Sequence, residues 1–340
     1  MLELPAADRF PDHPASWYYF CPSKLLRDRP LSRGLLGQHF VAYRTSSGAV
    51  AMLEGRCSHL GADLGKGCVK GDRLQCPFHN WEYGTDGLCQ HIPMSADIPA
   101  IARQAVFPVV ERHGHIYFYP GWQPRFDFPF FTDADPAEFV AARPFQATLN
   151  CPWYMIGANA FDLQHFRAAH DRRLVSDPSV STPHPLARRA SATFAVSGND
   201  WQDRLTRWFA GDEVTMAITD WCGNLMFATA TFRRTRSYGM VITEPLPAGK
   251  VTVRVLVHVP RRGPLDPLRL ELRRFFIRRF LASDAGRLDG TDYHPGSLIE
   301  PDRDLAEYFA WLARSARDTP GRSAVSTNGH HDSISTGSKS

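Results

Sequence analysis

The sequence predicts an α+β protein in which a small all-β domain precedes a larger domain of antiparallel strands and helices. Short β-type segments and glycines crowd the first 121 residues, and alternating apolar strands fill 191–259. Residues C-terminal to these strands, in 266–288 and 304–318, show helical patterns. We therefore expect one domain over 1–121, a second over 122–318, and a disordered Ser/Gly/Thr-rich tail over 319–340.

The bulk composition excludes several classes of protein. With 340 residues, 43% hydrophobic and 22% charged, the chain reads as globular. A net charge of +4 without a long basic run does not imply nucleic acid. Long apolar runs and a signal-peptide pattern are missing, so we expect no membrane span and a cytoplasmic location. Its seven cysteines would then stay reduced and free to bind metal.

The elements of the two domains follow from local patterns. Residues 39–53 predict a hairpin around a Ser-Ser-Gly turn, and the proline- and aromatic-rich 122–139 predict a linker. In the larger domain, 155–170 and 304–318 predict helices. The stretch 266–288 predicts an amphipathic helix, with its phenylalanines, Phe275, Phe276 and Phe280, toward the core.

Two mixed cysteine–histidine pairs lie in the small domain. Cys57 stands two residues before His59, and Cys76 stands three before His79. Such a set suits a structural zinc site. It suits a [2Fe–2S] centre better, with two cysteines on one iron and two histidines on the other, because each loop then supplies one ligand to each iron. No helix separates the pairs as in a zinc finger.

The stretch CSHLGADLGKGCVKGDRLQCPFHNW (57–81) resembles the Rieske motif of ring-hydroxylating oxygenases. The resemblance implies a Rieske [2Fe–2S] cluster on the two pairs. Family members often have glycine after the second histidine, where this chain has Asn80. We expect Asn80 to adopt the same left-handed backbone, which asparagine tolerates well. Within the family, this stretch is most similar to that of 3-ketosteroid 9α-hydroxylases.

A second set of ligand-type side chains, Asp162, His165 and His170, stands in NAFDLQHFRAAH. Two histidines and a carboxylate are the ligand set of non-haem Fe(II) enzymes. Histidines five apart on an ideal helix point about 140° away from each other, so a chance pair is the alternative. To share one iron they need a π-bulge or an early helix end near 167–169, which Asn159 would help to stabilise.

Downstream of a Rieske motif, this N-x-x-D-x-x-H-x₄-H pattern resembles the catalytic motif of the same family. The resemblance implies a mononuclear Fe(II) held by His165, His170 and an aspartate from a C-terminal helix. The family pattern F-x-x-x-D-x-x-x-L fits FLASDAGRL and makes Asp284 that ligand. Asp289 and Asp292 are the alternatives, and each of the three is otherwise a solvated helix charge.

The resemblance gives Asp162 a different role. In the family this aspartate bridges a Rieske histidine of one subunit to an iron-ligand histidine of the next. Here Asp162 would link the partner subunit's His79 to His165 across a head-to-tail interface, which closes most simply as a homotrimer. A carboxylate favoured by the helix dipole is the alternative.

The implied activity is that of a terminal oxygenase, which uses O₂ and electrons relayed through the Rieske cluster to the mononuclear Fe(II). The chain lacks a G-x-G-x-x-G nucleotide motif, so electrons would come from NAD(P)H through a separate ferredoxin and/or flavin reductase. The rival from another class is a Rieske electron-transfer protein without oxygenase activity. Such a carrier has no use for the second ligand set.

The substrate pocket is expected between the 155–170 helix and the concave face of a helix-grip-like catalytic domain. Abundant apolar side chains and no convergent charged cluster favour an apolar ring-containing substrate. The similarity to steroid hydroxylases favours monooxygenation of a steroid- or terpenoid-like compound. Aromatic ring dihydroxylation, O-demethylation and oxidative cyclisation are alternatives on the same scaffold. The candidate lining is Phe161, Phe166, Trp201, Trp208, Trp221, Met226 and Phe227.

Overall fold

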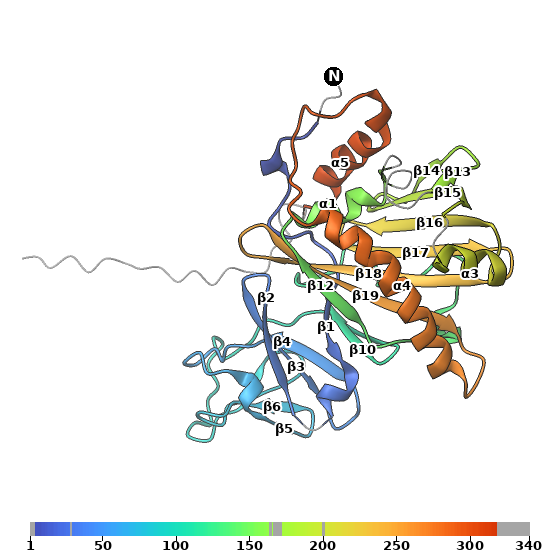
Figure 1. Ribbon diagram of the computed structural model, residues 1–340. Coiled ribbons are helices and arrows are strands. Elements are labelled where there is room, and N and C mark those ends of the chain that lie inside the picture. The colour runs from blue at the N-terminus through green and yellow to red at the C-terminus, as the bar shows by residue number, and fades with distance from the viewer. Residues whose placement is uncertain (1–3, 28, 163–164, 166–171, 199–200, 318–340) are drawn as a thin grey trace, which may run out of the picture.

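The computed structural model describes residues 4–27, 29–162, 165, 172–198 and 201–317. Figure 1 shows a small β-rich part beside a large sheet that is covered by helices. The predicted α+β class is confirmed. The predicted sites His170 and Phe166, and the tail from residue 319, lie outside the described residues. No helix within the described ranges is long and apolar enough to cross a bilayer.

The first part contains three small antiparallel sheets. The predicted hairpin at 39–53 is confirmed as the pair β3–β4. The first sheet is formed by β1 (Tyr18–Pro22), β10 (His115–Phe118) and β9 (Val109–Arg112). The second is formed by β2 (Leu31–Leu35), β3 (Gln38–Arg44) and β4 (Val50–Glu54). The third is formed by β5 (Cys68–Lys70), β6 (Arg73–Gln75), β7 (Glu82–Tyr83) and β8 (Cys89–His91).

The large sheet has nine strands, all paired antiparallel. Its path runs β11-β19-β18-β17-β16-β15-β13, with β12 on β19 and β14 on β15. The early strands are β11 (Phe139–Ala141), β12 (Phe145–Leu149), β13 (Arg172–Leu174), β14 (Ser179–His184) and β15 (Ala187–Val196). The later strands are β16 (Glu213–Trp221), β17 (Leu225–Phe232), β18 (Arg236–Leu246) and β19 (Lys250–Pro260).

The two faces of this sheet have different partners, because successive side chains of a strand point to opposite faces. One face packs on the β1-β10-β9 sheet and the linker through an aromatic cluster that includes Trp17, Tyr117 and Phe227. The other face packs against helices through a cluster that includes Tyr154, Phe161, Met226 and Tyr308. The aromatic cluster joins the small β-rich part to the large sheet. The cluster on the other face packs the helices against the sheet near Phe161.

The described helices are α1 (Trp153–Asn159), α3 (Trp201–Phe209), α4 (Asp266–Leu288) and α5 (Arg303–Ser315). Short 3₁₀ turns occur at Ala7–Arg9, Ser23–Leu26, Leu64–Lys66, Pro136–Glu138 and Glu300–Asp302. Helix α4 crosses the sheet over β19 and β12 (Figure 1). The predicted helix over 155–170 is not continuous. Helix α1 already ends at Asn159, and Ala160 is its C-cap.

The buried face of α4 differs from the prediction. Leu270, Ile277 and Asp284, spaced two turns apart, share one side of the helix, and Leu270 and Ile277 pack against the sheet. Phe275 is 55% exposed, so its predicted position toward the core is wrong. The reason is angular. At 100° per residue, Phe275 lies about 140° around the helix from Leu270 and about 160° from Ile277, which leaves it on the solvent side.

Candidate metal centres and the adjoining pocket

The two cysteine–histidine loops converge at one end of the small domain. Cys57 lies in the loop after β4, and Cys76 directly follows β6. The backbone N–H of Cys57 donates to Ala62 O and that of Cys76 to Trp81 O, which tightens each loop into a turn. The two cysteines approach each other, and so do the two histidines, while the assignment of all four side chains to one cluster stays a prediction.

The cysteine side of this centre is buried. Cys57 is 3% exposed and Cys76 is 2% exposed, and both belong to the apolar core of the domain. The Cys76 thiol lies within hydrogen-bonding reach of Cys57, and burial raises the pKa of Cys76. The Tyr83 hydroxyl lies 3.1 Å from Cys57 Sγ. Two thiolates side by side in an apolar core need a cation between them, which is what an iron cluster provides.

The histidine side of the centre is exposed to solvent. The rings of His59 and His79 are neighbours, with their centroids 4.8 Å apart. Trp81 stacks on His59 at 4.3 Å, nearly parallel, and Phe78 lies 4.0 Å from His79. These aromatic contacts restrict how the imidazoles can turn. Buried thiols on one side and exposed imidazoles on the other fit a cluster whose histidine-bound iron faces the surface.

Asn80 has the backbone conformation that the sequence predicted. Its φ is +58°, in the left-handed region that favours glycine. Asparagine tolerates this region because its short polar side chain costs less there than a branched one. The loop after His79 therefore turns without the usual glycine.

A second centre forms where α4 approaches the segment after α1. His165 Nε2 lies 3.2 Å from Asp284 Oδ1, and both side chains are nearly buried. Two ligand atoms bound to one metal at about 2.1 Å and right angles would lie about 3 Å apart. The same separation is that of an ordinary hydrogen bond, so the role of both side chains as ligands of one ion stays a prediction. His170, the other predicted ligand, lies outside the described residues.

The two alternative carboxylates are engaged elsewhere. Asp289 Oδ1 accepts hydrogen bonds from Asn150 N and Nδ2, at 2.7 and 2.9 Å, and these bonds lower the pKa of Asp289. Asp292 Oδ1 accepts from Tyr293 N at 2.8 Å. Of the three aspartates proposed from the sequence, only Asp284 contacts His165 among the residues that the structure describes.

Asp162 and Asn159 lie at the entry to this centre. Asp162 Oδ1 accepts from the backbone N–H of His165 at 3.1 Å, so the carboxylate caps the turn that carries the histidine. This contact matches the helix-terminus alternative for one oxygen of Asp162. Asn159 is the last residue of α1. The bridging role of Asp162 and the supporting role of Asn159 stay predictions.

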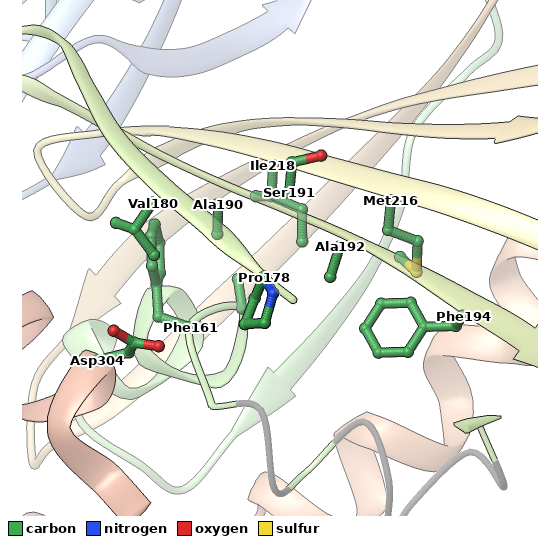
Figure 2. Close-up of a pocket in the computed structure, with 11 residues that line it drawn as sticks. Phe161, Pro178, Val180, Ala190, Ser191, Ala192, Phe194, Met216, Ile218 and Asp304 are labelled. Carbon is green, nitrogen blue, oxygen red and sulfur yellow. The ribbon is translucent and has the colours of Figure 1, made fainter. Parts of the chain in front are cut away.

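A small apolar pocket lies between the sheet and the segment that follows α1 (Figure 2). Phe161 and Val180 lie at one end, and Phe194 and Met216 at the other. Between these ends lie the small side chains of Ala190 and Ala192, and the enclosed space among the described residues is only about 20 Å³. The complete lining is Ala160, Phe161, Pro178, Val180, Ala190, Ser191, Ala192, Phe194, Met216, Ile218 and Asp304.

The predicted lining residues are distributed over several sites. Phe161 lines the pocket. Trp201 and Trp208 on α3 are 46% and 69% exposed. Met226 and Phe227 are buried in the two cores on opposite faces of the sheet, and Trp221 stacks on Phe126 of the linker. The sequence identified large apolar side chains, but the pocket also takes lining from three alanines, Ala160, Ala190 and Ala192, which carry no such signal.

One buried pair near the pocket was missed. Asp220 on β16 is fully buried, and the Tyr308 hydroxyl donates to its Oδ2 at 2.6 Å. Burial raises the pKa of Asp220 to about 7. Tyr308 also stacks on Phe161, with the centroids 4.4 Å apart. An aspartate in the apolar alternation TMAITDW was the available signal, since a strand residue in phase with Met216 and Ile218 shares their face.

Comparison with known proteins bears on the small domain and on the fold. The family model of the Rieske [2Fe-2S] domain matches residues 16–103. Aminopyrrolnitrin oxygenase of Pseudomonas fluorescens is 33% identical over 166 residues, 46% of each chain. Cholesterol 7-desaturase of Ciona intestinalis is 29% identical over 51% of this chain and 38% of its own. The oxygenase component of 3-ketosteroid-9-alpha-monooxygenase of Mycolicibacterium smegmatis is 36% identical over 30% and 27%.

The chain thus spans under half the length of these curated relatives. The solved structures cover much more of it. Dicamba monooxygenase bound to 3,6 dichlorosalicylic acid superposes with a TM-score of 0.66 at 21% identity, over 88% of this chain and 97% of the other. Pseudomonas putida CBB5 NdmA with caffeine gives 0.66 at 20%, over 88% and 89%. Residues 16–103 are therefore a Rieske [2Fe–2S] domain, and the chain as a whole has the fold of Rieske oxygenase terminal components.

Proposed function

We propose that this protein is a terminal oxygenase that uses O₂ and relayed electrons to monooxygenate an apolar ring-containing substrate. The observation that carries the proposal is the contact of His165 with Asp284, 3.2 Å apart beside an apolar pocket. When bound, a Rieske cluster would supply single electrons and a mononuclear iron would supply O₂ activation. A carrier protein would gain nothing from the second centre.

The residues of the first centre hold and expose a redox group. Cys57 and Cys76 would bind the inner iron from the core, and Tyr83 would donate a hydrogen bond toward Cys57. A hydrogen bond to a cluster sulfur stabilises its reduced form. His59 and His79 would bind the outer iron and present their ring edges to an electron partner. We expect that partner to be a ferredoxin and/or a flavin reductase that draws electrons from NAD(P)H.

The residues of the second centre position an iron beside the pocket. His165 and Asp284 would provide two ligands, and His170 the third. The nearly buried position of both described side chains excludes bulk water from the ligands. Phe161, which precedes Asp162 by one residue, lines the pocket and so connects the two in sequence.

We propose a head-to-tail homotrimer for the electron path. The strands β5 and β6, which flank the Rieske loops, and the helix α1 lie in separate parts of the molecule in Figure 1. Electron transfer from the cluster of one subunit to the iron of the next would not have to cross the distance between the two centres within one subunit. Asp162 would accept from the partner subunit's His79 and from His165, and so hold both imidazoles in one tautomer. The oxygen of Asp162 that does not cap His165 N is available for such a bond among the described contacts.

The substrate proposal draws on the pocket and on the relatives. The lining is alanine, phenylalanine and branched aliphatic side chains, which suits a flat hydrophobic ring system. Two of the relatives are named for sterols or ketosteroids. We therefore propose a steroid- or terpenoid-like compound. Ring dihydroxylation, O-demethylation and oxidative cyclisation use the same two centres and are the alternatives that product analysis would separate.

The deciding experiment measures iron and acid-labile sulfide in anaerobically purified protein, with an EPR spectrum after reduction. About three irons and two sulfides per chain, with a Rieske signal, are expected for the oxygenase. Two irons and two sulfides, in protein that binds no further Fe(II), would instead favour an electron carrier. Turnover of a steroid and aromatic panel with a surrogate reductase then identifies the reaction. Hydroxylation of simple aromatics alone would reject the steroid class.

A further inference from the structure

Helix α4 carries apolar side chains on two opposite sides. Leu270 and Ile277 pack against the sheet. On the other side, Leu268, Leu272 and Phe275 are 68%, 57% and 55% exposed. Their spacing of four and three residues places them in one row along the solvent side of the helix. A surface helix ordinarily has a single apolar stripe that faces the core, so the second row indicates a partner outside the described chain.

Arginines continue this exposed row toward the C-terminal end of α4. Arg279 lies four residues after Phe275 and about 40° around the helix from it, and Arg278 borders the row. The Arg279 guanidinium lies over the ring of Trp201 on the neighbouring helix α3, 5.3 Å from its centroid (Figure 1). Trp201 is itself 46% exposed. The α3–α4 patch is formed by Leu268, Leu272, Phe275, Arg278, Arg279 and Trp201.

The charge of the α3–α4 patch is positive. Glu271 is the only exposed acid of α4, and two neighbouring arginines already pair with it. The other two acids of the helix are buried. Within the described ranges, neither Arg278 nor Arg279 forms an ion pair, and both are exposed. Arg261 and Arg262, in the loop before α4, are exposed as well. The exposed row therefore offers cations without carboxylates of its own to neutralise them.

These charges decide between the partners that could cover the row. A second copy related by a two-fold axis would place the same patch on itself, so arginines would face arginines. A bilayer with anionic lipids offers negative headgroups to the arginines and acyl chains to the apolar side chains. Leucine, phenylalanine and tryptophan beside arginine are the residues that bind at the boundary between headgroups and acyl chains.

We propose that the α3–α4 patch docks the protein on an anionic lipid bilayer, with α4 lying along the membrane surface. The apolar row would enter the headgroup layer while the arginines contact lipid phosphates. The contact needs no helix that crosses the bilayer. It goes beyond the proposed function and does not depend on it. The same helix carries Asp284, about 14 Å beyond Phe275 along its axis, so a docked protein would hold the second centre near the lipid.

The test is co-sedimentation of the metal-loaded full chain with lipid vesicles. Vesicles of phosphatidylcholine alone are compared with vesicles in which about 30% of the lipid is phosphatidylglycerol. The protein should bind the anionic vesicles at least about tenfold more tightly. Raising NaCl to about 0.5 M should weaken this binding, because salt screens the attraction between the arginines and the headgroups.

A matched pair of double variants makes the result specific. Leu272→Gln with Arg278→Gln removes one exposed leucine and one exposed arginine from the patch, and should weaken binding to the anionic vesicles at least about tenfold. Leu25→Gln with Arg27→Gln makes the same exchange at a 3₁₀ turn of the small β-rich part, where Leu25 is 52% exposed and Arg27 is exposed. That control should bind as the wild type does. Circular dichroism and a thermal midpoint check the fold of each variant.

Three results would overturn the inference. The first is no binding to either kind of vesicle at millimolar lipid, and the second is equal weakening by both double variants. The third is self-association in analytical ultracentrifugation that only the α4 double variant abolishes, in protein that does not bind vesicles. A second copy would then cover the patch. Equal affinity for neutral and anionic vesicles would refute the role of the arginines and with it the anionic surface as partner.

Discussion

The two candidate metal centres of this chain are assembled over very different sequence distances. The Rieske ligands come from two turns within 57–79 and are supported by one small core. In the second centre His165 and Asp284 are 119 residues apart and meet only because α4 crosses the sheet toward α1. The first centre therefore depends on local turns, and the second on the packing of a whole domain. Mutations should separate the two kinds of dependence.

The largest expected effect is loss of one centre without the other. Cys76→Ser should remove the iron and sulfide of the cluster, because a serine hydroxyl is not a thiolate at neutral pH. The second centre should still bind about one Fe(II) per chain. His165→Ala should do the reverse and keep the Rieske EPR signal. Iron, sulfide and EPR measurements on both variants check this. If Cys76→Ser also abolished Fe(II) binding, the centres would not be independent.

The next effect tests which aspartate joins His165. Asp284→Ala should weaken Fe(II) binding by at least about 100-fold, since loss of a ligand exceeds the effect of losing an outer partner. Asp289→Ala is the control. It should leave the iron affinity unchanged and lower the stability slightly through the lost bonds to Asn150. Fe(II) titration and urea unfolding measure the two quantities. The reversed pattern would make Asp289 the ligand.

The difference between the centres also explains which features could be predicted from the sequence. Four ligands within a short stretch, the left-handed Asn80 and the strands of both domains were predictable from local patterns. Asp284 could be chosen over Asp289 and Asp292 only by resemblance, because helix packing decides which carboxylate meets His165. The pocket could not be predicted either. Part of its lining is alanine, and Asp304 lines it from a helix far along the chain from Ala190 and Ala192.

Asp220 offers a pH test of the packing around the second centre. Its pKa is raised by burial to about 7, against an ordinary value of 3.8. The folded state therefore binds a proton that the unfolded state releases between these values. Stability from this group is full below about pH 4 and falls by up to about 1.4 kcal/mol per pH unit until about pH 7.

We expect Asp220→Asn to remove this slope and to gain up to about 4 kcal/mol at pH 8, because the amide is neutral yet still accepts from Tyr308. Urea unfolding at pH 5, 6, 7 and 8 measures the difference. Tyr308→Phe is the companion variant. It removes the hydrogen bond that lowers the pKa of Asp220, so its slope should extend to higher pH. Parallel pH profiles of wild type and Asp220→Asn would show that Asp220 does not titrate in this range.

The smallest effect concerns the Rieske loop alone. Asn80→Gly should change stability by only about a few tenths of a kcal/mol, because φ of +58° suits both residues. Asn80→Val should cost about 1–2 kcal/mol, since a branched side chain is strained in the left-handed region. The strain lies next to His79, so the visible absorption of the cluster should also be lost faster on warming.

Asp133 provides the matched control for that prediction. It too has a left-handed backbone, with φ of +60°, but it lies in the linker and away from the ligand loops. Asp133→Val should cost a similar free energy of unfolding and leave the rate of cluster loss unchanged. Equal acceleration by both valine variants would mean that global stability protects the cluster, and the local character of the first centre would then be refuted.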